Sequence, residues 1–297
     1  MRSAFIDELC SAAEKDTSII LVVGDLGFGV VEDFAKRFPK QFINAGVAEQ
    51  NMMGLCAGLA SEGCKVFAYS IANFPTFRCA EQIRNDIDYH QLPVTIVSVG
   101  GGLSYGSLGY SHHAIQDYAL MRSMPNMLIA SPGDPMEVRA CMRFLIKNPQ
   151  PSYLRLAKAG EPSMHLDVPN VEPGVWVSVK KRFSTNTFLT TGGGLGLVFN
   201  QVDSQRELEK LSVHSLPLWG MKYKAIQPFQ VNNFEKIITV EDHLVDGGFG
   251  SWLIEALLGN KEILNKIDVR ALSSNVCGMV GSANALISQS NLWSNLK

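Results

Sequence analysis

The chain lacks three features that would each narrow its class. Its 26 basic and 28 acidic residues leave a formal net charge of −2, so it has no electrostatic footprint for nucleic acid. No apolar run approaches the roughly 18 residues that a membrane-spanning helix needs. The N-terminal residues include Asp7 and Glu8 and lack the continuous apolar core of a secretory signal. We therefore expect no binding to nucleic acid and no association with a membrane.

A cysteine pattern is also missing. The chain has six cysteines, none of them in a C-x-x-C pair. Several lie in apolar segments, which favours buried free thiols over disulfides or zinc ligands. Free thiols are typical of a reducing compartment, so we expect the protein to be cytoplasmic.

What is present points to a soluble α/β protein. The chain of 297 residues is 46% hydrophobic and 18% charged, as expected for a sizeable core. Short apolar runs alternate with helical patterns up to about residue 160, which predicts a doubly wound, mostly parallel sheet. We expect two domains, at 1–160 and 187–297, the second a smaller α/β unit. The stretch 161–186 is rich in breakers and charge and is predicted to be a linker that holds a short strand.

One stretch organises the first domain. A short apolar strand end at Phe42 is followed by a helix that closes at Gly63. We expect Asn44 to cap this helix and one face of it to be apolar, formed by Val47, Met52, Leu55, Cys56 and Leu59. Glu49 lies in the first turn, where a carboxylate is electrostatically favoured. By itself this glutamate is an ordinary helix-end acid.

The string Gly46-Val47-Ala48-Glu49-Gln50-Asn51, with a helix of small residues after it, resembles the pyrimidine-binding domain of the transketolase and deoxyxylulose-phosphate synthase family. The resemblance implies that Glu49 hydrogen-bonds the aminopyrimidine ring of thiamine diphosphate. It would favour an imino tautomer whose nitrogen takes the proton of the thiazolium carbon. Asp25, in the exit loop of the first strand, corresponds to a family aspartate near the thiazolium.

A second resemblance lies in the segment that runs from Tyr69 into Arg78-Cys79-Ala80-Glu81-Gln82-Ile83. In the family, an aromatic ring of this segment stacks on the aminopyrimidine. Alignment on Arg78 favours Phe74 as that ring, with Phe77 as the second candidate, although both also fit as core aromatics. Arg78 would then lie near the cofactor. We expect one helix from Thr76 to about Tyr89.

Two further strings concern the substrate. Leu108-Gly109-Tyr110-Ser111-His112-His113 resembles a family loop whose histidine contacts substrate, and His112 falls on that histidine. Leu108 stands where transketolases carry an acid that recognises a substrate hydroxyl, so the substrate stays open. The strand Pro151–Leu156 resembles the one whose arginine, here Arg155, clamps a substrate phosphate, and guanidinium suits phosphate bidentately.

A string near the C-terminus extends the resemblance to the second domain. Glu241-Asp242-His243 is followed by Gly247-Gly248, similar to the C-terminal domain of the same family. There the acid–x–His step is structural and contributes to subunit contacts. We therefore do not count these three residues as catalytic.

One half of the family's site is missing from the sequence. The Gly-Asp-Gly motif and following Asn that hold magnesium do not occur. The resemblance therefore implies a partner, an N-terminal transketolase subunit that carries the diphosphate-binding domain and the Mg²⁺ ligands, in an α2β2 heterotetramer.

The expected function is that of the C-terminal subunit of a split transketolase. It would transfer a two-carbon unit between sugar or sugar-phosphate-like carbonyl compounds. One alternative is the β subunit of a 2-oxo acid dehydrogenase, which more typically carries His-Ser-Gln where Ser111-His112-His113 stands here. The other is a non-catalytic scaffold, against which the joint presence of Glu49, Phe74, His112 and Arg155 argues.

Overall fold

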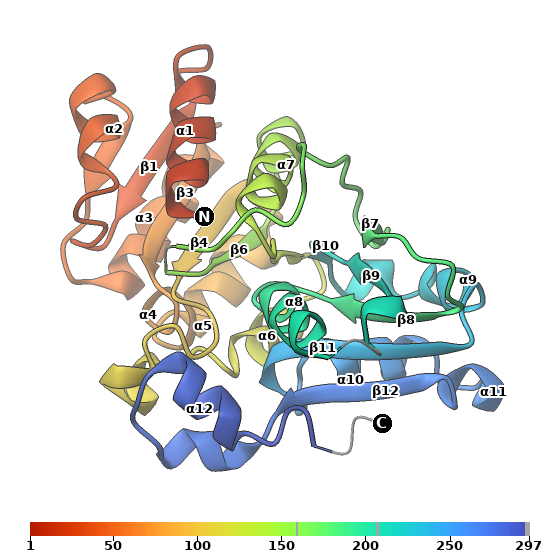
Figure 1. The fold of residues 1–297 in the computed structure, drawn as a ribbon. Coiled ribbons are helices and arrows are strands. Elements are labelled where there is room, and N and C mark those ends of the chain that lie inside the picture. The colour runs from red at the N-terminus through yellow and green to blue at the C-terminus, as the bar shows by residue number, and fades with distance from the viewer. Residues whose placement is uncertain (159, 206–207, 295–297) are drawn as a thin grey trace.

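The computed structural model describes residues 1–158, 160–205 and 208–294. Two α/β units lie side by side, each built on one sheet (Figure 1). The first sheet has the strand order β10-β5-β6-β4-β3-β1-β2, and the second β12-β11-β8-β9-β7. The predicted α/β class with a doubly wound, mostly parallel sheet is confirmed.

The first sheet is parallel except at one edge. Its strands are β1 (Ile19–Val23), β2 (Phe42–Asn44), β3 (Lys65–Ile71), β4 (Val94–Val99), β5 (Leu128–Ala130), β6 (Ser152–Leu156) and β10 (Leu218–Trp219). The edge strand β10 comes from the C-terminal half of the chain and pairs antiparallel with β5. The sequence analysis did not predict this strand, which ties the second unit to the first sheet.

The second sheet is also mostly parallel. Its strands are β7 (Val177–Lys180), β8 (Asn186–Thr190), β9 (Ser212–Ser215), β11 (Lys236–Leu244) and β12 (Ile267–Leu272). Only β7, which lies within the predicted linker 161–186, runs antiparallel to its neighbour. The helices of this unit are α8 (Gly194–Ser204), α9 (Gln227–Val231), α10 (Phe249–Ala256), α11 (Lys261–Leu264) and α12 (Ala283–Gln289).

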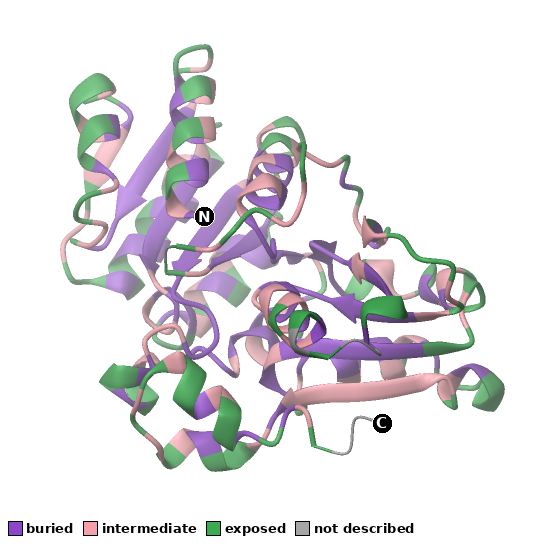
Figure 2. Ribbon diagram, viewed as in Figure 1, coloured by how far each residue is buried: buried purple, intermediate pink, exposed green. Residues whose placement is uncertain are grey.

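Helices cover both faces of the first sheet. They are α1 (Arg2–Ala13), α2 (Glu32–Arg37), α3 (Glu49–Ser61), α4 (Phe74–Phe77), α5 (Ala80–Gln82), α6 (Asp117–Met121) and α7 (Pro135–Lys147). Side chains of α1, α2 and α7 pack on one face, and those of α3 and of the π-helix Ile83–Asp88 on the other. Consequently β1, β4 and β6 are buried along their whole length (Figure 2), which explains their continuous apolar sequence. Among the helices of the described residues, none is long and apolar enough to cross a membrane.

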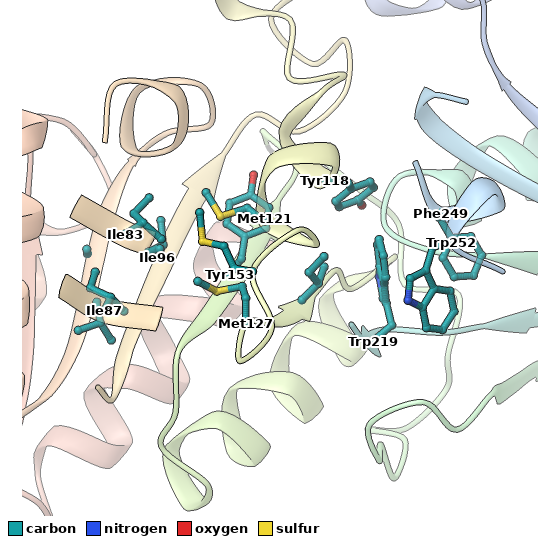
Figure 3. Close-up of a cluster of buried hydrophobic side chains, with 14 of the residues drawn as sticks. Ile83, Ile87, Ile96, Tyr118, Met121, Met127, Tyr153, Trp219, Phe249 and Trp252 are labelled. Atoms are coloured by element: carbon teal, nitrogen blue, oxygen red, sulfur yellow. The ribbon is translucent and has the colours of Figure 1, made fainter. Parts of the chain in front are cut away.

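The core is continuous between the two units. Figure 3 shows a buried cluster that runs from Ile83 and Ile96 of the first unit, through Tyr153, to Trp219 and Trp252. The rings of Trp219 and Trp252 lie 5.3 Å apart, centroid to centroid. Burial of large aromatic rings dominates packing energy, so the two units are joined by a hydrophobic core.

Two local predictions are wrong. Asn44 does not cap α3, because its Oδ1 accepts from the backbone N–H of Gly46, 2.9 Å away, and the helix begins later, at Glu49. The predicted apolar face of α3 is also shifted. Val47 is 73% exposed and Leu55 36% exposed, whereas Met53 and Ala57 are buried.

The predicted helix from Thr76 to Tyr89 is also wrong in its continuity. The chain instead forms the short helices α4 and α5 and then the π-helix Ile83–Asp88. The wider π-helical turn keeps Ile83 and Ile87 in the core, and such turns are common near functional sites.

Candidate active site

The candidate site residues line one edge of the first sheet. Asp25, Glu49, Phe74 and His112 follow the carboxyl ends of β1, β2, β3 and β4. Because these strands are parallel, their exit loops gather at the same edge, where open α/β sheets bind ligands. In Figure 1 this edge lies at the lower left, next to α4 and α5.

Glu49 carries an unused acceptor. It is the first residue of α3 and only 4% exposed. Its Oε2 accepts from Arg78 Nη1 at 3.1 Å, while its buried Oε1 has no hydrogen-bond partner among the described residues. Buried polar atoms are nearly always paired, so an orphaned carboxylate oxygen at a sheet edge indicates a place for a donor from outside the chain.

Phe74 and Arg78 form a flat wall beside this carboxylate. The Arg78 guanidinium carbon lies 3.9 Å from the centroid of the Phe74 ring, a cation–π contact. A cavity of about 460 Å³ opens here, lined by Asn73, Phe74, Phe77, Arg78, Tyr110, Ser111 and Gln116. Phe77 is 49% exposed on this lining. Arg78 covers one face of Phe74, so a flat ligand stacks on that face only after the half-exposed Arg78 side chain moves aside.

His112 meets the same wall from the other side of the site. Its ring packs edge-on to Phe74, with centroids 5.3 Å apart, and lies 6.2 Å from the Tyr105 ring. Ser111 Oγ is 3.0 Å from its Nδ1. Partial burial lowers the pKa of His112, and the positive charge of Arg78 and the neighbouring His113 lower it further. The imidazole is therefore neutral at physiological pH.

Asn73 fixes the loop that carries His112. Its Nδ2 donates to the carbonyl oxygens of Ser111 and His113, at 3.2 and 2.8 Å. These two bonds tie the segment after β3 to the segment after β4. The sequence analysis did not single out Asn73, although its place directly before Phe74 and after a buried strand is a usable signal.

Asp25 lies beside the turn that leads into α3. Its backbone φ is +55°, a conformation that Asp and Asn adopt more readily than most residues. Asn44 Nδ2 donates to Asp25 Oδ1 at 2.9 Å. The exposed Asp25 carboxylate is thus held at the same edge as Glu49, on the side of β1 and β2.

Arg155 does not reach the cavity. Its side chain is 2% exposed, and its N–H groups donate to Asp117, Tyr118, Ala114 and Asp242. Because a guanidinium has only five N–H groups, none remains for a ligand. The expected contact with a substrate phosphate is not supported, and we leave Arg155 out of the substrate site.

An exposed cation stands closer to the site. Lys158, two residues after β6, places its Nζ 5.2 Å from the centroid of the Tyr105 ring. Tyr105 in turn contacts His112. The sequence analysis missed Lys158, which its position after a strand end could have flagged. Within the described residues, no cluster of His, Cys, Asp and Glu could hold a metal ion.

Comparison with known proteins identifies the family. A family model described as "Transketolase, pyrimidine binding domain" matches residues 1–161. A curated relative from Phocaeicola vulgatus, one of the two subunits of an apulose-4-phosphate transketolase, is 33% identical over 267 residues, which cover 87% of this chain and 84% of the relative. A 6-deoxy-6-sulfo-D-fructose transketolase subunit from Clostridium sp. is 27% identical over 280 residues, covering 91% and 84%.

A solved structure agrees over nearly the whole chain. It is described as "Split gene transketolase, inactive beta4 tetramer" and matches with a TM-score of 0.82 and 28% identity, covering 98% of this chain and 93% of that chain. The chain therefore belongs to the transketolase family, in which it corresponds to the C-terminal subunit of a split enzyme.

Proposed function

We propose that this chain binds the aminopyrimidine of thiamine diphosphate at Glu49 and acts in the transfer of a two-carbon unit between sugar or sugar-phosphate-like carbonyl compounds. The observation that carries the proposal is the orphaned, buried Oε1 of Glu49. An aromatic amine offers an N–H donor to such an oxygen, and the Phe74 ring offers a flat apolar wall beside it.

Each residue then has a defined task. Glu49 holds and exchanges a proton at its free oxygen while Arg78 holds the other oxygen in place. Phe74 stacks on the pyrimidine after Arg78 moves off its face, and Asp25 lies toward the thiazolium. His112, neutral at physiological pH, hydrogen-bonds the substrate. The cofactor supplies the electron-accepting thiazolium that makes cleavage beside a carbonyl feasible.

We further propose that the diphosphate and Mg²⁺ are held by an N-terminal subunit in an α2β2 assembly. Exposed apolar side chains follow successive strand ends at the candidate edge, with Phe28 76%, Val47 73% and Phe77 49% exposed. Apolar groups of this size are typical of a surface that a partner covers. The split-gene relative described as an inactive beta4 tetramer is consistent with a chain that needs this partner. The six free cysteines support a reducing, cytoplasmic setting.

Cofactor binding tests the proposal. We expect thiamine diphosphate with Mg²⁺ to bind the mixture of this chain and the N-terminal subunit at micromolar or lower concentration. The isolated chain should bind at least about 100-fold more weakly, because it lacks the diphosphate anchor. Calorimetry measures both. Equal binding by the isolated chain would contradict the partner requirement, and no binding by either sample would favour the scaffold alternative.

The nature of the substrate's end group gives a second test. The names of the relatives from Phocaeicola vulgatus and Clostridium sp. refer to substrates with a phosphate or a sulfonate. Lys158 is an exposed cation that reaches toward His112 through Tyr105. We expect Lys158→Ala to raise KM for a phosphorylated acceptor about tenfold, the effect of losing one charge-assisted contact, with kcat nearly unchanged.

Steady-state kinetics with a phosphorylated and an unphosphorylated acceptor separate the two possible outcomes. The unphosphorylated acceptor should show no such change. Lys181→Ala, in an exposed position of the second unit, serves as the control. An equal effect of Lys158→Ala on both acceptors would contradict a role in binding phosphate.

A further inference from the structure

We propose that Arg155 and Asp242 form a positioning pair through which the second unit sets the loop that carries His112. This inference rests on the proposed function, since it concerns how that site is held ready. The pair joins β6 of the first unit to β11 of the second. Arg155 Nη1 donates to Asp242 Oδ1 at 2.7 Å, and Nη2 also donates to the Asp242 carbonyl oxygen.

Arg155 holds the base of the loop directly. The loop is closed at its base by an antiparallel bridge between Gly102 and Ala114, with backbone bonds of 2.8 and 2.9 Å. Arg155 Nη2 donates to the carbonyl oxygen of Ala114 at 2.7 Å. The guanidinium thus fixes the strand of the loop that leads away from His112, two residues beyond it.

Two glycines allow this close approach. A Cβ on Gly101 would lie 2.7 Å from the Arg155 guanidinium carbon. A Cβ on Gly102 would collide with the Asp242 carboxylate, and its φ of +66° also favours glycine. The glycine-rich start of the loop, which follows β4, is therefore shaped to pack on both members of the pair.

Charge balance makes the pair sensitive to loss of Asp242. Arg155 is buried between two carboxylates, Asp117 at 2.7 Å from its Nε and Asp242 at 2.7 Å from its Nη1. Removing one partner of a buried ion pair leaves an imperfectly compensated charge. Arg155 would then shift toward Asp117, and its hold on Ala114 would loosen. The outer part of the loop has a separate support, since Gly281 N donates to the Gly106 carbonyl oxygen.

The variant Asp242→Asn tests the inference, with Asp246→Asn, an exposed acid on the same segment, as the control. Amide hydrogen exchange of 101–114 is measured in the full chain assembled with its N-terminal subunit. We expect exchange in this segment to be at least about tenfold faster in Asp242→Asn and unchanged in Asp246→Asn. Exchange in α3, which carries Glu49, should stay the same.

Activity provides the second readout. We expect Asp242→Asn to lower kcat about 10- to 100-fold, because small displacements of a reacting group have effects of this size, with the Kd for thiamine diphosphate within twofold of wild type. A role in stability alone would lower Tm and cofactor binding together. Arg155→Lys, which keeps the charge but loses the forked donors, should reproduce the faster exchange and keeps the test open if Asp242→Asn folds poorly.

Unchanged exchange in 101–114 would overturn the inference, as would faster exchange with wild-type kcat. Failure of the proposed function has a different signature, an assembly of wild-type chains that neither binds thiamine diphosphate nor turns over. In that case the exchange experiment still decides whether the pair holds the loop.

Discussion

Glu49→Gln, assembled with the diphosphate-binding subunit, is expected to lose about 10²- to 10⁴-fold in kcat, the usual contribution of a general acid–base group. Glutamine fills the same space and can still accept a hydrogen bond, so the Kd for thiamine diphosphate should rise no more than about tenfold, as expected for one hydrogen bond. It cannot, however, take up or release a proton at the position of Oε1. Single-turnover kinetics and calorimetry separate the two effects.

The matched control is Glu62→Gln, at the other end of α3, where the side chain is exposed. It should keep wild-type kcat and cofactor affinity. A loss in Glu49→Gln smaller than about tenfold would argue that the orphaned oxygen has no part in proton transfer. A loss of cofactor binding as large as the loss of kcat would assign Glu49 to binding alone.

Much of the fold followed from local sequence patterns. The runs Ile19–Val23 and Val94–Val99 are apolar at nearly every position because helices cover both faces of the sheet, and this identifies central parallel strands. By contrast, β10 is two residues long and is held to β5 by a distant segment of chain. No short-range pattern encodes such a pairing, because its stability comes from tertiary contacts.

The same distinction applies to the site. Glu49, Phe74 and His112 could be proposed from sequence strings, since each lies in a characteristic local context. The role of Arg155 could not, because it depends on Asp117 and Asp242, which are 38 and 87 residues away. A strand arginine with two buried carboxylates holds structure together, whereas the same arginine at an open edge would bind an anion. Sequence alone does not distinguish the two.

His112→Gln is expected to reduce kcat/KM about 10²-fold or more, again the range for a group that exchanges protons or hydrogen bonds with substrate. The pH profile carries the more specific expectation. Partial burial and the charge of Arg78 lower the pKa of His112, so the imidazole stays neutral down to a more acidic pH than an ordinary histidine. The acid limb of kcat/KM for the wild-type assembly should therefore lie below about pH 6.5, the ordinary value.

In His112→Gln that acid limb should disappear, because glutamine does not titrate, while any alkaline limb should remain. His90→Gln, at an exposed position on the same unit, should keep both the wild-type rate and the wild-type profile. An acid limb that persists unchanged in His112→Gln would assign it to another group and leave His112 without a titrating role. A limb above about pH 6.5 in the wild type would contradict the lowered pKa, since protonation of a histidine packed beside Arg78 and Phe74 is disfavoured both by burial and by charge.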